Sequence, residues 1–109
     1  MRLIVAIVLA LAALPAAAAP RVSGLTARQV ASLEVQVAVT ITRPTPLDMV
    51  CDTTVALGDG NNRLVNFGVG DRHTKTLQHK YAKAGTFKVS VKAQGKCQGA
   101  RDVTVNVAR

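Results

Sequence analysis

The stretch LQHKYAKAGTFKVSV, residues 77–91, decides how the rest of the chain is interpreted. Apolar and polar residues alternate at both of its ends, which is typical of half-buried β-strands. The alternation breaks at residues 83–85, and the glycine there, Gly85, favours a bend. The stretch therefore predicts two strands joined by a turn, at residues 76–81 and 86–93.

The same period of two recurs on both sides of this stretch. Residues 33–42 read LEVQVAVTIT, with Leu, Val and Ile on one face. Residues 21–32 are interpreted as a weak edge strand with a bend rather than as a short helix opening at a Thr26–Gln29 capping box. Further strands are expected at residues 50–57, 64–67 and 103–107, and turns at 43–46, 58–62, 68–71 and 94–100. Short strands at intervals of roughly 8 to 14 residues, with no convincing helix, predict an all-β, antiparallel sandwich of about seven strands.

Residues 1–19 have a different character. A charged start at Arg2 is followed by an apolar run from residue 3 to 14, then Pro15 and four alanines. This is the pattern of a secretory signal peptide. A membrane anchor is the rival interpretation, but the run falls short of the roughly 20 residues that span a bilayer. Cleavage is expected near Ala18 or Ala19, which leaves residues 20–109 as a single exported domain, periplasmic or extracellular, with no stable membrane insertion.

The chain has two cysteines, Cys51 and Cys97. In an exported protein an even cysteine count predicts a disulfide. Closing this loop of about 45 residues would remove on the order of 4 kcal/mol of unfolded-state entropy in the chain-entropy model. The alternatives are two buried thiols or a metal pair, but neither cysteine has a second ligand at C-x-x-C spacing. A bridge suits a small domain, whose core alone gives marginal stability.

Three motifs, in this order, resemble those of the PKD domain, an immunoglobulin-like sandwich of extracellular proteins. They are Gly58-Asp59-Gly60, His79-x-Tyr81 and Gly85-x-Phe87-x-Val-x-Val. The resemblance extends from Val55 to about Val107. It departs from the family at Val55, where the family has tryptophan, at Leu57, where it has phenylalanine, and at Phe87, where it usually has tyrosine.

The resemblance implies an immunoglobulin-like fold in which residues 50–57 and 86–93 are the neighbouring strands C and F. A bridge between the two cysteines would then pin one end of that strand pair rather than cross the core. The resemblance also places His79 and Tyr81 at a corner of the sandwich. We expect them to be structural, with their polar tips bonded to nearby backbone.

Sites for chemistry are sparse in this sequence. His73 and His79 are six residues apart, about 20 Å on an extended strand, so one ion cannot bind both together with Asp71. The turn at residues 59–62 lacks the later acidic ligands and closing glutamate of a calcium loop. No G-x-S-x-G motif is present, and the serines at 23, 32 and 90 have no context that suggests activation. The sequence predicts no enzyme, no metal and no cofactor.

Basic residues are the strongest remaining signal. Without Arg2 the chain carries 13 basic and 6 acidic residues, a net charge of +7. The interpretations left open are a solvated surface that aids solubility and a face for an anionic partner. The only aromatic residues are Phe67, Tyr81 and Phe87, so stacking platforms for nucleic acid are not expected. The candidate face consists of Lys75, Lys80, Lys83, Lys88, Lys92, Lys96 and Arg101.

These observations predict a non-catalytic exported module that binds an as yet unknown protein or envelope component, or that serves as a structural unit. The alternative is a binder of anionic polysaccharide or lipid headgroups through the lysine-rich face. A small hydrolase or metal protein ranks well behind both.

Overall fold

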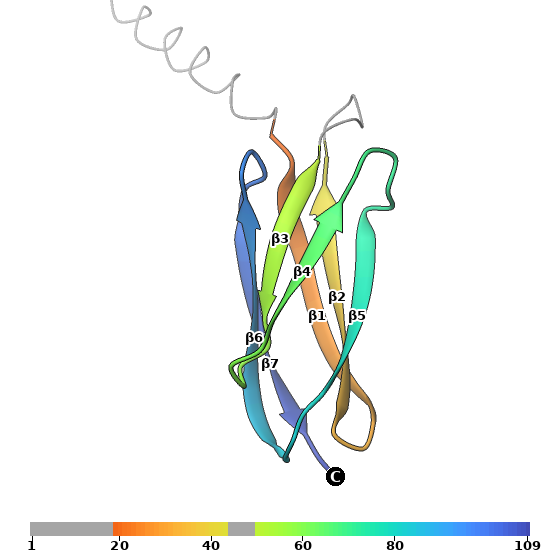
Figure 1. The fold of residues 1–109 in the computed structure, drawn as a ribbon, viewed down its shortest axis with the longest axis vertical. Coiled ribbons are helices and arrows are strands. Elements are labelled where there is room, and N and C mark those ends of the chain that lie inside the picture. The colour runs from red at the N-terminus through yellow and green to blue at the C-terminus, as the bar shows by residue number, and fades with distance from the viewer. Residues whose placement is uncertain (1–18, 44–49) are drawn as a thin grey trace, which may run out of the picture.

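The computed structural model describes residues 19–43 and 50–109, and these residues form seven strands and no helix (Figure 1). The predicted all-β class is confirmed. The predicted signal peptide, but for Ala19, and most of the predicted turn at residues 43–46 lie outside the described residues. The strands are β1 (Arg21–Ala31), β2 (Glu34–Thr42), β3 (Cys51–Ala56), β4 (Asn62–Phe67), β5 (Thr74–Lys80), β6 (Gly85–Gln94) and β7 (Ala100–Val107).

The described strands form two antiparallel sheets that pack face to face (Figure 1). One sheet has the order β1-β2-β5, and the other has the order β4-β3-β6-β7. β3 and β6 are antiparallel neighbours, as the comparison with strands C and F predicted. The order is that of an immunoglobulin-like sandwich, except that the fourth strand pairs with β3 instead of β5.

The core lies between the sheets and follows the alternation of the strands. Every second residue of β2 is buried, from Val35 to Ile41, and so are Val89 and Val91 of β6. Thr53 is buried among them, and its hydroxyl donates to the carbonyl of Val65 at 2.8 Å, which satisfies a polar group inside an apolar layer. The buried face of β3 and the residue after it comprises Cys51, Thr53, Val55 and Leu57.

Most strand ends differ from the prediction: β5 begins at Thr74, β6 extends to Gln94, and β7 begins at Ala100 inside the predicted turn. Two further differences come from local turns. β4 begins at Asn62 rather than Leu64, since the N–H of Leu57 donates to the carbonyl of Asn61 at 2.9 Å and closes the turn early. Leu33 does not begin β2. It lies in the β1–β2 turn with φ of 59°, and its carbonyl accepts a bond from the N–H of Tyr81 at 2.8 Å.

β1 is an irregular edge strand, as predicted, and the short helix considered at residues 26–29 does not form. Its pairing with β2 shifts register twice, near Gly24 and near Val30. Backbone bonds also tie this side of the sandwich to residues flanking β7: Val22 N–H donates to Gln98, and Leu33 N–H donates to Ala108. These bonds close the sandwich on the β1–β7 side.

The disulfide between Cys51 and Cys97 is present, as predicted, with the two Cα atoms 5.1 Å apart. Cys51 is the first residue of β3, and Cys97 lies in the β6–β7 turn, so both belong to the four-stranded sheet. The bridge therefore joins neighbouring strands at one end of that sheet and does not cross the core.

Reduction of this disulfide should destabilise the domain by about 4 kcal/mol, because a loop of 46 residues regains its unfolded-state entropy. Thermal unfolding with and without reductant measures this effect. The double variant Cys51→Ala with Cys97→Ala serves as the control, since its melting midpoint should not respond to reductant. A wild-type midpoint unchanged by full reduction would contradict the stabilising role of the bridge.

Candidate functional site

The motif residues gather at the end of the sandwich opposite the disulfide. The β3–β4 turn needs glycine at position 58, where φ is 86° and a Cβ would approach the carbonyl oxygen of Lys88 to 2.7 Å. Asp59 stabilises the turn by accepting a bond from the N–H of Asn61 at 3.1 Å. The Gly-Asp-Gly motif therefore places one carboxylate against the neighbouring sheet.

His79 meets this carboxylate from the other sheet. Its Nε2 lies 2.7 Å from Oδ2 of Asp59, and the side chains are only 10% and 17% exposed, respectively. Burial raises the pKa of the Asp59 carboxyl, but hydrogen bonds from His79 and Asn61 outweigh this effect, and the net pKa is lowered. His79 thus has a carboxylate partner rather than the backbone partner expected from the sequence.

Tyr81 has the backbone partner that was expected. Its hydroxyl donates to the carbonyl of Leu57 at 2.7 Å, and the residue is almost fully buried. The ring lies edge-on to His79, with centroids 4.6 Å apart, and stacks on Phe87 at 4.1 Å. Burial, with a smaller contribution from Asp59, raises the pKa of the Tyr81 hydroxyl, so it remains a neutral donor.

Candidate metal ligands do not converge. Asp71 accepts bonds from the N–H of Gly68 at 2.7 Å and from Nζ of Lys75 at 2.9 Å. His73 precedes β5 and His79 lies near its far end, so the strand separates the two imidazoles. Among the described residues, no three His, Cys, Asp or Glu side chains are grouped as a metal site.

A cavity of about 250 Å³ lies beside the His79–Tyr81 cluster. It is smaller than the roughly 300–1,000 Å³ of most small-molecule pockets, so it suits a single ring-sized group. Lys80 and Lys83 line it and form no ion pair with another described residue. The full lining is Asp59, Asn61, Lys80, Tyr81, Ala82, Lys83 and Phe87.

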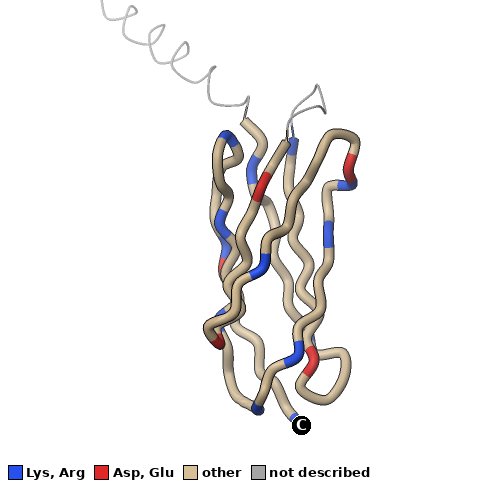
Figure 2. The backbone as a smooth tube through the Cα atoms, viewed as in Figure 1, with Lys and Arg blue, Asp and Glu red and all other residues tan. Residues whose placement is uncertain are grey.

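The seven predicted basic residues do not share one face, and Figure 2 shows basic positions along both sheets. Lys80 lies on β5, in the three-stranded sheet, whereas Lys88 and Lys92 lie on β6, in the other sheet. Lys75 is also on β5 and pairs with Asp71.

The bases of the four-stranded sheet form a second group. Lys88 lies 3.4 Å from Asp102 in an exposed pair, which contributes little to stability. Lys92 and Arg101 border an open hollow of about 460 Å³ that is lined by paired residues of β6 and β7. Lys96 lies nearby in the β6–β7 turn. Lys80 and Lys83, the pocket pair, thus lie in a different region of the surface from this group.

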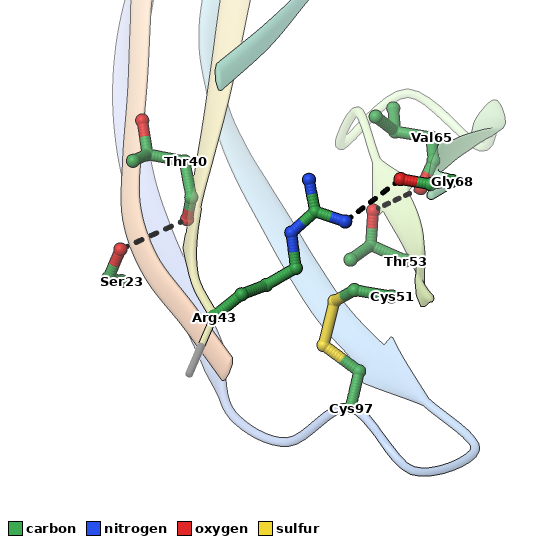
Figure 3. Close-up of a disulfide and its surroundings, with 8 residues drawn as sticks. All are labelled: Ser23, Thr40, Arg43, Cys51, Thr53, Val65, Gly68 and Cys97. Atoms are coloured by element: carbon green, nitrogen blue, oxygen red, sulfur yellow. Dashed lines mark hydrogen bonds between the residues drawn. A yellow bond between two sulfur atoms is a disulfide. The ribbon is translucent and has the colours of Figure 1, made fainter. Parts of the chain in front are cut away.

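Arg43 is a buried residue, although the sequence predicts it only as part of a turn. It is 6% exposed, and its guanidinium donates to the carbonyls of Gly68, at 2.8 Å, and Asp71. Figure 3 shows its side chain reaching toward Gly68 next to the disulfide. The signal was present in the alternation, since position 43 continues the inward series of odd-numbered residues in β2. Arg43 holds the β4–β5 loop in place.

Within the described residues no helix is long and apolar enough to cross a membrane. Comparison with known proteins gives no relative: no family model, curated protein or solved structure matches the chain. The resemblance to the PKD domain therefore stays a prediction that the motif residues carry.

Acid should weaken the contact between Asp59 and His79. Because the pKa of Asp59 is lower in the folded state, its contribution to stability is present above the unfolded pKa of about 4 and is lost as pH falls through the folded value. Asp59→Asn should therefore lower the melting midpoint at pH 7, and the difference from wild type should shrink near pH 2.5.

The matched control is Asp52→Asn, which removes an exposed carboxylate that forms no ion pair with another described residue. Its midpoint should follow that of the wild type at both pH values. An Asp59→Asn midpoint equal to wild type at pH 7 would show that the contact between Asp59 and His79 does not stabilise this end of the sandwich.

Proposed function

We propose that this protein is a non-catalytic interaction module of the cell envelope, with a sandwich that resembles a PKD domain, and that it binds a protein or another envelope component. One observation carries the proposal. The groups best suited to chemistry, on Asp59, His79 and Tyr81, bond to one another or to backbone within the fold. Lys80 and Lys83 line the same pocket as Asp59 and Tyr81 but form no ion pair with another described residue. Asp59, His79 and Tyr81 stabilise this end of the sandwich, and the two lysines are available to bind a partner.

Export is part of this proposal. The apolar leader pattern of residues 1–19 supports it, and so does the disulfide, because structural disulfides persist in oxidising compartments. N-terminal sequencing of the protein recovered from an exporting host tests cleavage near Ala18 or Ala19.

A second candidate is the capture of anionic polysaccharide or lipid headgroups. The observation that favours it is the convergence of Lys80 and Lys83 on a cavity bordered by Tyr81 and Phe87, with a carboxylate and an amide at its rim. Cations beside aromatic rings can hold an acidic ring-shaped group by charge and by packing. Because the lysines divide between the two sheets, this candidate uses the pocket pair rather than all seven bases.

Salt separates the two candidates. The oxidised protein, immobilised and incubated with an envelope extract, should retain a protein partner at both about 0.1 M and about 1 M salt, where the Debye length falls from about 10 Å to about 3 Å. Retention of an anionic polymer should fall steeply over the same range, because charge supplies most of that attraction. Lys80→Gln with Lys83→Gln should weaken either kind of binding.

The matched control is Lys88→Gln with Lys92→Gln, which removes the same charge from the other sheet and should leave binding unchanged. Full binding by the Lys80, Lys83 double variant would exclude the pocket as the site. Failure of the wild-type protein to retain any component at either salt concentration would contradict an interaction function.

A further inference from the structure

β4 is the least guarded of the edge strands in the described structure. β1 carries two register shifts and lies beside β7, and β5 ends in Lys80. The side chain of Lys75, also on β5, reaches β4 and donates to the carbonyl of Asn66. β4 pairs with β3 through six consecutive residues without a shift, and its sequence, NRLVNF, contains neither proline nor lysine. Bulges, lysines and prolines are the usual protections of a sheet edge. β4 therefore presents a regular strand to which another strand can add.

The outward backbone groups of β4 can be assigned from their bonds. The carbonyl of Val65 faces β3, since it accepts a bond from the Thr53 hydroxyl. The carbonyl of Asn66 faces away from β3, where Nζ of Lys75 donates to it at 2.7 Å. Because the direction alternates along a strand, the backbone groups that point away from β3 belong to Asn62, Leu64 and Asn66.

The residue types at these three outward positions, Asn, Leu and Asn, are the same in either chain direction. If two copies of β4 lie antiparallel about a twofold axis at Leu64, then Leu64 faces its own copy and Asn62 faces Asn66 of the second chain. Each facing pair is of the type that exchanges both N–H···O bonds. The carbonyl oxygen of Asn66 has two lone pairs, so it can accept from the second chain while it keeps its bond from Lys75. The edge is self-complementary, as a twofold interface requires.

Side chains also favour a second copy at this edge. Leu64 is 70% exposed in the single chain and would be covered by its copy. The net positive charge of the whole protein is not concentrated here. Arg63 is the one charged residue of β4, and Lys75 is paired with Asp71. Asp52 of β3 lies opposite Asn66 of β4.

We propose that the protein forms a twofold dimer in which two β4 strands pair antiparallel about Leu64 and join the two four-stranded sheets into one continuous sheet. The second chain supplies the strand that this edge lacks in the described structure. None of the residues that line the pocket belongs to β4, although one of them, Asn61, directly precedes it.

Sedimentation equilibrium of the oxidised protein over a wide concentration range tests the dimer. The wild-type protein should show a monomer–dimer equilibrium. Leu64→Lys should raise the dissociation constant by about tenfold or more, because two ammonium groups then face each other on the axis and the leucine contact is lost. Thr76→Lys, which adds the same charge to the exposed face of β5, should dimerise as the wild type does.

A cysteine at position 64 tests the register. Directly opposite residues of a bonded pair have Cα atoms about 5.5 Å apart, which is within disulfide range, so Leu64→Cys should form a covalent dimer under mild oxidation. Thr76→Cys should not. A wild-type protein that is monomeric at every concentration would overturn the proposal, and so would a dimer that Leu64→Lys leaves unchanged while its melt shows it to be folded.

Discussion

The hydroxyl of Tyr81 donates a hydrogen bond to the carbonyl of Leu57, and this bond joins the two sheets at the end of the sandwich opposite the disulfide. Leu57 directly follows β3, in the four-stranded sheet, and Tyr81 directly follows β5, in the three-stranded sheet. Both residues are buried, and a buried carbonyl that loses its partner is costly. The turn at Gly58, the Asp59–His79 contact and the stacking on Phe87 are all arranged around this position.

The sandwich is therefore fixed at two places along β3. At the first residue of β3, the disulfide ties Cys51 to the β6–β7 turn, and Arg43 secures the neighbouring β4–β5 loop. Beyond the other end of β3, the hydrogen bond from Tyr81 to Leu57 joins the sheets. Between these ends the core consists mainly of valine and contains few aromatic rings, and small cores give small margins of stability. Covalent and polar contacts at the two ends supply what a larger aromatic core would supply elsewhere.

Much of this fold could be predicted from alternation alone, because a period of two assigns each residue to the inner or outer face of its strand. Alternation does not say which sheet a strand joins. Lys80 and Lys88 both point outward and are close in sequence, yet the β5–β6 connection passes from one sheet to the other and separates them. The Asp59–His79 contact, between residues 20 apart, depends on the same packing of the two sheets. Neither the division of the lysines between the sheets nor the Asp59–His79 contact could be predicted without the arrangement of the sheets.

The contribution of the Tyr81–Leu57 hydrogen bond can be tested by removing the hydroxyl of Tyr81. Tyr81→Phe keeps the ring and its stacking on Phe87 but removes the hydroxyl that donates to the Leu57 carbonyl. Urea unfolding measures the effect on stability. If this hydrogen bond holds the sheets together, the free energy of unfolding should fall by about 1–3 kcal/mol with an unchanged m-value, because the Leu57 carbonyl stays buried without its partner. A variant as stable as the wild-type protein would show that the sheets are held together without this bond.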